Sequence, residues 1–106
     1  MEKFNEKQKE KALELVALLL STSGQEENRD DSEYISDTKI VVELTDQRDY
    51  EPFKVIIRPD GIALFDIEFQ QVFFSEPFND EGILELYVYI RNTGIINEIK
   101  VPKEGS

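Results

Sequence analysis

The hydrophobic positions of this chain first follow a helical period and then alternate with polar ones. Over residues 1–21, apolar side chains recur every three or four positions, which predicts an amphipathic helix. Asn5 and Gln8 form a capping pair that favours a helix start at this point. The main stripe of this helix, which we expect to be its buried face, consists of Phe4, Gln8, Ala12, Leu15 and Leu19, widened by Leu13, Val16 and Leu20.

Residues 52–69 show the strongest strand pattern, interrupted by a proline, an aspartate and a glycine that together suit a turn. We expect a β-hairpin with a three-residue loop at 59–61. A loop of this length sets a register that pairs Ile56 with Leu64. A two-residue loop at 60–61 would set carboxylates beside the apolar side chains, so the pattern favours the longer loop. The expected core face of the hairpin is Phe53, Val55, Ile57, Ala63, Phe65 and Ile67.

Further alternating runs predict three more strands, at residues 39–45, 83–91 and 95–101. In the last pair an even-numbered loop keeps one face apolar, and it sets Val88 opposite Ile99. Residues 70–80 are rich in phenylalanine but broken by a proline, and they fit either a bulged continuation of the preceding strand or an aromatic lid over the sheet edge.

These elements predict an α+β fold in which one N-terminal helix packs on a strongly curved antiparallel β-meander of five or six strands. A single helix is about 10 Å wide, whereas five strands span roughly 20–24 Å. The sheet would therefore have to curl around the helix, or residues 70–80 or a second chain would have to complete the cover. We expect one domain over residues 1–106, consisting of a helix at 1–21, an acidic mobile linker at 22–37 and the antiparallel sheet at 38–102.

The amino-acid composition mainly indicates which kinds of functional site the chain does not contain. The chain has no cysteine and no histidine, which removes thiol nucleophiles, disulfides and imidazole ligands. Asp66 and Glu68 share a strand face, but we expect Asp66 to pair with Lys54, and so short a chain leaves little room for a substrate groove. Carboxylates at positions 46, 49 and 51 lie close in sequence but match no metal-binding motif. We therefore expect a protein that is not an enzyme and has no catalytic residues, cofactor or metal.

The net charge of −11 indicates what kind of partner the chain binds. So acidic a protein is poorly suited to nucleic acid or to anionic membranes, and it favours a basic protein surface. Glu14 interrupts an apolar run that is too short to span a bilayer, which favours a cytoplasmic location over secretion.

We therefore expect an acidic binding protein, of the inhibitor or immunity type, that presents carboxylates and tyrosines to a basic protein surface. Tyrosine suits an interface anchor because it buries a large area and keeps a hydroxyl. The expected anchors are Tyr87 and Tyr89, flanked by the acids of the strands, Glu43, Glu85 and Glu98. Acids of the linker would steer the partner during association, namely Glu26, Glu27, Asp30 and Asp31.

Two alternatives remain open at this stage. The second face of the sheet also carries apolar residues, such as Val41 and Ile56. Such a face fits a homo-oligomeric structural or chaperone-like subunit, including a homodimer. A curled sheet closed by the helix would instead fit a carrier of a small apolar ligand, which would copurify with the protein.

Overall fold

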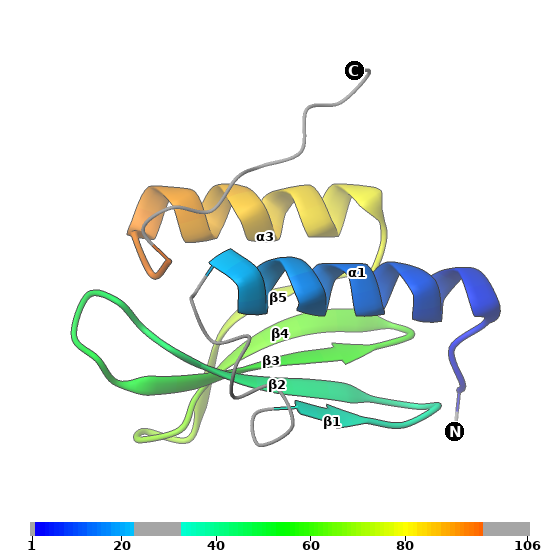
Figure 1. Ribbon diagram of the computed structural model, residues 1–106, viewed down its shortest axis with the longest axis horizontal. Coiled ribbons are helices and arrows are strands. Elements are labelled where there is room, and N and C mark those ends of the chain that lie inside the picture. The colour runs from blue at the N-terminus through cyan, green and yellow to red at the C-terminus, as the bar shows by residue number, and fades with distance from the viewer. Residues whose placement is uncertain (1, 23–32, 97–106) are drawn as a thin grey trace.

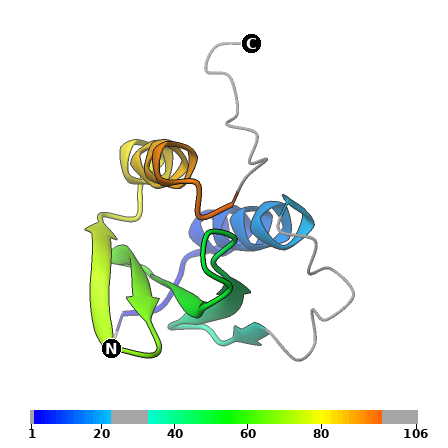
Figure 2. The same cartoon turned by 90° about the vertical axis from the view of Figure 1, so that its left-hand side faces the viewer.

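The computed structural model describes residues 2–22 and 33–96. Two helices lie over one face of a five-stranded antiparallel sheet with the strand order β1-β2-β3-β4-β5 (Figures 1 and 2). The chain is therefore α+β, and its sheet is a meander with sequential neighbours throughout. Its elements are α1 (Glu6–Thr22), β1 (Glu33–Ile35), β2 (Ile40–Thr45), β3 (Pro52–Arg58), β4 (Gly61–Asp66), β5 (Gln71–Glu76) and α3 (Asp80–Thr93).

Helix α1 begins as the sequence predicts. The backbone N–H of Gln8 donates to the Asn5 side chain at 2.8 Å, and the Gln8 side chain accepts from the Asn5 N–H at 3.0 Å. This reciprocal pair satisfies two N–H groups that a helix start otherwise leaves without partners. The expected stripe is confirmed from Ala12 onward, and the buried residues of α1 are Ala12, Leu15, Val16, Leu19 and Leu20. The other expected members, Phe4, Gln8 and Leu13, are only half-buried.

Helix α3 replaces the strand that we expected at residues 83–91. The side chain of Asn79 accepts the Gly82 N–H at 2.8 Å, which caps the start of the helix. At the other end, Gly94 adopts a left-handed φ of 78° and donates its N–H to the Ile90 carbonyl. The expected pairing of Val88 with Ile99 is wrong because Val88 is helical; Ile99 lies outside the described residues.

The central hairpin exists, but its expected register is wrong by one residue. Arg58 pairs with Gly61, so the loop holds only Pro59 and Asp60, and Ile56 lies opposite Ala63. The buried face is consequently Phe53, Val55, Ile57, Ile62 and Leu64.

Asp66 explains why the shorter loop is tolerated. It lies opposite Phe53 at the last position of β4, where it is only half-buried. Its carboxylate accepts the backbone N–H of Phe69 at 3.0 Å and so stabilises the turn into β5. A carboxylate at this end of the strand therefore does not have to enter the core.

Residues 71–76 do not continue the preceding strand: the chain turns back, and they form a separate strand, β5, that pairs with β4 across a register shift between Leu64 and Phe65. The shift lets two successive phenylalanines of β5 reach the helix layer, where Phe73 and Phe74 both contact the ring of Tyr89. β5 is thus joined to α3 by aromatic packing.

The sheet is not strongly curled, contrary to our expectation. α3 packs on β4 and β5 while α1 packs on β2, so two helices share the cover that we assigned to one (Figure 2). Strand β1 occupies part of the expected linker, and residues 23–32 of that linker lie outside the described residues. Within the described residues, no helix is long and apolar enough to cross a membrane.

Candidate functional site

The anchors and acids expected from the sequence do not share one face. Tyr87 is only 6% exposed, and burial together with the charge of Glu14 raises the pKa of its phenol to about 12. Tyr89 is half-buried on α3, and Glu85 is exposed on the same helix. Glu43 is exposed on β2, between two buried residues, and so points away from the helices. The remaining expected residues, Glu26, Glu27, Asp30, Asp31 and Glu98, lie outside the described residues.

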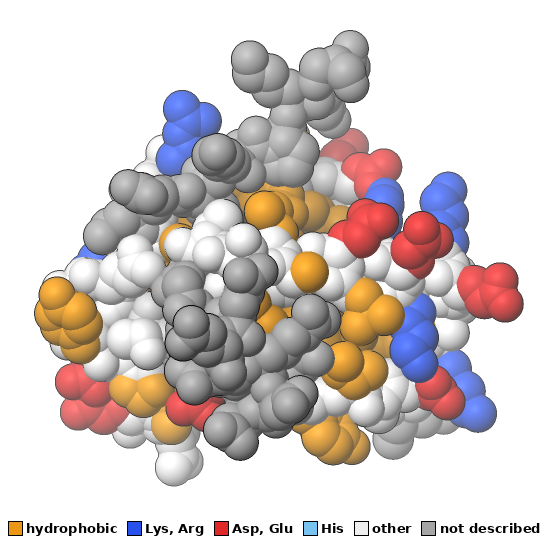
Figure 3. Space-filling model, viewed as in Figure 1, with side chains coloured by type: hydrophobic (Ala, Val, Ile, Leu, Met, Phe, Trp, Pro, Cys, Tyr) orange, Lys and Arg blue, Asp and Glu red, His pale blue; other side chains and the backbone are white. Residues whose placement is uncertain are grey.

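A group of carboxylates lies instead where two connections of the meander meet, at the left end of the ribbon in Figure 1. Figure 3 shows some of the acidic side chains at this end, and more of them at the opposite end of the molecule. The β2–β3 and β4–β5 connections lie at the same end because an antiparallel meander reverses direction at every turn. The first carries Asp49 and Glu51, and the second adds Asp66 and Glu68. The four groups are close enough that the charges of Glu68, Asp49 and Asp66, with some burial, raise the pKa of Glu51.

These carboxylates surround a hollow of ≈ 290 Å³, which we call the acidic hollow. Aromatic rings line it as well: Phe53 from β3, Phe73 from β5 and Tyr89 from α3. Phe73 contacts both of the other rings, with centroids 6.3 Å from Phe53 and 6.2 Å from Tyr89. Phe69 also borders the hollow and is 69% exposed. The hollow therefore combines negative charge with ring surfaces.

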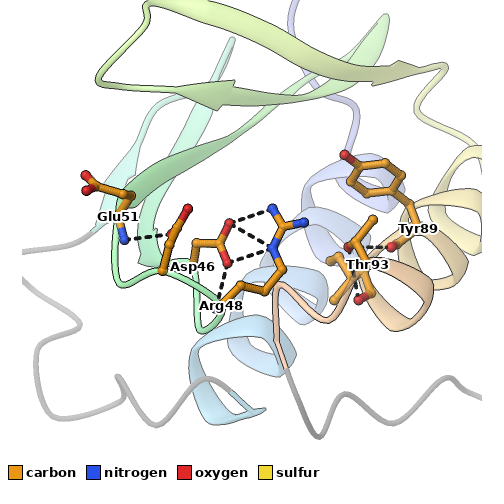
Figure 4. Close-up of polar contacts among 7 residues, drawn as sticks. Asp46, Arg48, Glu51, Tyr89 and Thr93 are labelled. Atoms are coloured by element: carbon orange, nitrogen blue, oxygen red, sulfur yellow. Dashed lines mark hydrogen bonds and ion pairs between the residues drawn. The ribbon is translucent and has the colours of Figure 1, made fainter.

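One ion pair braces the β2–β3 connection at the edge of the acidic hollow (Figure 4). The guanidinium of Arg48 donates to Asp46 from Nε to Oδ1 at 3.0 Å and from a terminal nitrogen to Oδ2 at 2.7 Å. The backbone N–H of Arg48 also donates to Oδ1, at 2.9 Å. The loop is tied to the end of α3 because Gln47 donates its N–H to the Ile95 carbonyl at 2.8 Å. Asp46 is thus the main partner of Arg48, whose guanidinium also lines the hollow and interacts with the charge of Asp49.

Tyr50 occupies an unusual position in the same connection. Its φ is 63°, a left-handed value that costs a residue other than glycine about 1–3 kcal/mol, and its side chain is 81% exposed. Hydrogen bonds on both sides hold it there, from the Tyr50 N–H to the Asp46 carbonyl and from the Asp46 N–H to the Glu51 carbonyl, both at 2.8 Å. The loop therefore displays an aromatic ring at a conformational cost.

The Asp46–Arg48 pair leads to a pH-dependent prediction. Burial alone raises the pKa of Asp46, but the hydrogen bonds and charge of Arg48 outweigh it and lower the pKa below the ordinary value of 3.8. A carboxyl with a depressed folded-state pKa stabilises the protein above its unfolded-state pKa, and the effect is lost as the pH falls through the folded value. We expect Asp46→Asn to cost about 1–3 kcal/mol at neutral pH.

Urea denaturation of the wild type and Asp46→Asn, measured from neutral pH to below 3.8, checks this expectation. The stability difference should shrink at the acidic end of the series. A difference that stays constant across the series would contradict the assigned pairing.

Most of these carboxylates can be picked out in the sequence, but nothing in it indicates that they meet, and Tyr50 and Phe69 were not among the expected site residues. No local sequence signal indicates that either aromatic residue belongs to a site. Both lie in strand connections that the meander places at the same end of the sheet. Among the described residues, no group of three or more acidic side chains is arranged to hold a metal ion. Comparison with protein-family models, with curated proteins and with solved structures finds no match for this chain.

Proposed function

We propose that this chain is a non-enzymatic binding protein whose acidic hollow receives a lysine or arginine side chain from a basic segment of a partner protein. The observation that carries the proposal is the placement of four carboxylates around one hollow that aromatic rings also line. The direction in which the pKa of the exposed Glu51 is shifted agrees with this arrangement, because the nearby charge of Glu68 above all raises it. The free protein holds these like charges together against their repulsion. A cation placed among them would convert this repulsion into attraction.

The aromatic lining makes an amino-acid side chain a better fit than a bare ion. Lysine and arginine carry long aliphatic stems that pack on apolar surfaces while the charged head reaches polar groups. Rings such as Phe73 and Tyr89 can take the stem or attract the cation through their faces. Arginine suits the site best because its planar guanidinium can bond two carboxylates at once and stack on a ring.

The charge of the whole chain supports the same partner. A net charge of −11 attracts a basic segment over a long range and speeds its association, an effect that salt screens. The exposed ring of Phe69 borders the hollow, and the exposed Tyr50 lies between Asp49 and Glu51 in the chain, so both rings could add contact area on docking. An inhibitor that covers a basic surface of its target would use the same physics.

An arginine-rich peptide and the same peptide with glutamine at each arginine test the proposal by calorimetry. We expect the arginine peptide alone to bind, and Glu51→Gln/Glu68→Gln to weaken its binding by about tenfold or more, because close charge pairs across an interface carry over a kcal/mol each. The matched control is Glu81→Gln/Glu85→Gln, which removes the same charge from exposed positions on α3. It should change the affinity far less.

The same variants report on folding. Because like charges raise the pKa of Glu51, Glu51→Gln should leave the protein as stable as the wild type or more so, which separates a binding defect from a folding defect. Equal loss of affinity in both double variants would mean that only net charge matters, and it would contradict a specific acidic hollow.

A further inference from the structure

The face of the sheet opposite the helices carries a band of apolar side chains, which we call the open face. Residues that alternate with buried positions on β2, β3 and β4 must point to this side. Within the described residues no helix covers this face, since both helices lie on the other one (Figures 1 and 2). The apolar residues of the open face are Tyr34, Val41, Ile56, Ala63, Phe65 and Val72.

The strand register makes these residues contiguous. Tyr34 lies opposite Val41, Val41 opposite Ile56, and Ile56 opposite Ala63, so one apolar row crosses four strands. Phe65 and Val72 pair with each other beside this row. Tyr34 is 58% exposed and Val72 56% exposed. Val41, Ile56 and Phe65 are half-buried but do not belong to the side chains that pack against the described core.

Charge distinguishes the open face from the rest of the molecule. Its charged side chains in the described strands are one carboxylate, Glu43, and two cations, Lys54 and Arg58. Lys39, just before β2, adds a third cation, with its ammonium 5.9 Å from the centroid of the Tyr34 ring, so the net charge of the face is about +2. The chain as a whole carries −11. Two acidic surfaces from two copies would repel each other strongly, whereas two open faces carry only a small like charge. Glu43 and Lys54 are direct cross-strand neighbours, so a two-fold axis can set each against its opposite in the other copy.

We propose that two copies of this chain form a symmetric dimer by packing their open faces against each other. Two sheets that pack face to face lie about 10 Å apart with their strands offset by about 30°, as in a β-sandwich. Each open face would then be covered by the other, and the apolar row would become a second core. The acidic hollow lies on the side of the helices, because Tyr89 of α3 lines it, so a dimer would present two hollows to a partner.

Sedimentation equilibrium of the full chain tests the dimer without any variant. We expect a mass twice the 12.3 kDa of one chain at micromolar to millimolar concentrations. A wild type that stays at the mass of one chain throughout this range overturns the proposal.

Two substitutions test whether the open face forms the dimer interface. Ile56→Lys and Phe65→Lys put like charges opposite each other across a symmetric interface, and each should weaken the dimer by about a hundredfold or more. The matched control is Val88→Lys, which adds the same charge at a residue of α3 that is 38% exposed. It should leave the dimer intact.

The variants also separate this dimer from other assemblies. Lys54 and Arg58 already occupy outward positions of β3, so Ile56→Lys should fold, which circular dichroism will confirm. A dimer that survives both open-face substitutions would have to form elsewhere, for example along the edge of β5, and the proposal would be wrong. If Ile56→Lys does not fold, Phe65→Lys gives the same answer from the neighbouring strand.

Discussion

Replacing Gly82 with alanine is expected to destabilise the protein by about 2–4 kcal/mol, although alanine is the better helix former by about 1 kcal/mol. A Cβ atom at this position would lie 1.8 Å from the carbonyl oxygen of Pro77 and 2.9 Å from its carbonyl carbon. Both atoms belong to backbone, so no side-chain rotation can relieve the clash. The turn that leads into α3 would have to move, and the Asn79 cap on the Gly82 N–H would be disturbed with it.

Urea denaturation compares Gly82→Ala with Gly61→Ala as the matched control. A Cβ atom at Gly61 would lie 3.3 Å from the Glu76 carbonyl oxygen, which a shift of a few tenths of an ångström accommodates. We therefore expect a much smaller change at Gly61. A Gly82→Ala protein as stable as the wild type would show that the chain does not enter α3 through this close turn.

Replacing Leu19 with alanine is expected to cost about 2–5 kcal/mol. Leu19 is fully buried in the stripe with which α1 packs against the core. Deleting its side chain removes apolar contacts and leaves a cavity that a close-packed interior fills only in part. The loss should appear as a lower denaturation midpoint with an unchanged slope, because the surface exposed on unfolding stays nearly the same.

Leu13→Ala on the same helix is the matched control, because Leu13 is only half-buried. It should cost clearly less than Leu19→Ala. A loss below about 0.5 kcal/mol at Leu19 is the range of exposed positions and would contradict the packing of α1.

The sequence predicted α1 correctly because its period and its cap agree, whereas at α3 the period is ambiguous. Residues 83–91 alternate, yet Leu86, Tyr87 and Ile90 also form one side of a helix, and these are the residues that the structure buries. The decisive signals were the flanking residues, Asn79 before the segment and Gly94 after it. Weighing caps above alternation would have given the helix, and with it a second cover for the sheet.

The hairpin register failed for a different reason. Both faces of β3 and β4 carry apolar residues, so Ile56, Ala63 and Phe65 fit a core face as well as their neighbours do. Alternation specifies register only where one face is clearly polar. The residues that made the predicted hairpin register wrong are therefore residues of the open face.

The types of residue in the candidate site could be predicted from the sequence, but their position in the fold could not. Carboxylates beside aromatic rings were expected, and Tyr89 does line the acidic hollow, but Tyr87 is buried in the core. Bringing Glu51 and Glu68 together required the order of the strands, because 17 positions separate them in the chain. No local motif reports that two connections share one end of a sheet.

The most direct test of the acidic hollow is a titration of isotope-labelled protein with the arginine-rich peptide, followed through the backbone amide signals. We expect the largest shifts in the two connections that carry the carboxylates, at residues 46–51 and 66–70, and around Tyr89. The amides of β2 and β3 at the open face, such as those of Val41 and Ile56, should move little. Shifts centred on other elements, or shifts that the glutamine peptide reproduces, would contradict the account.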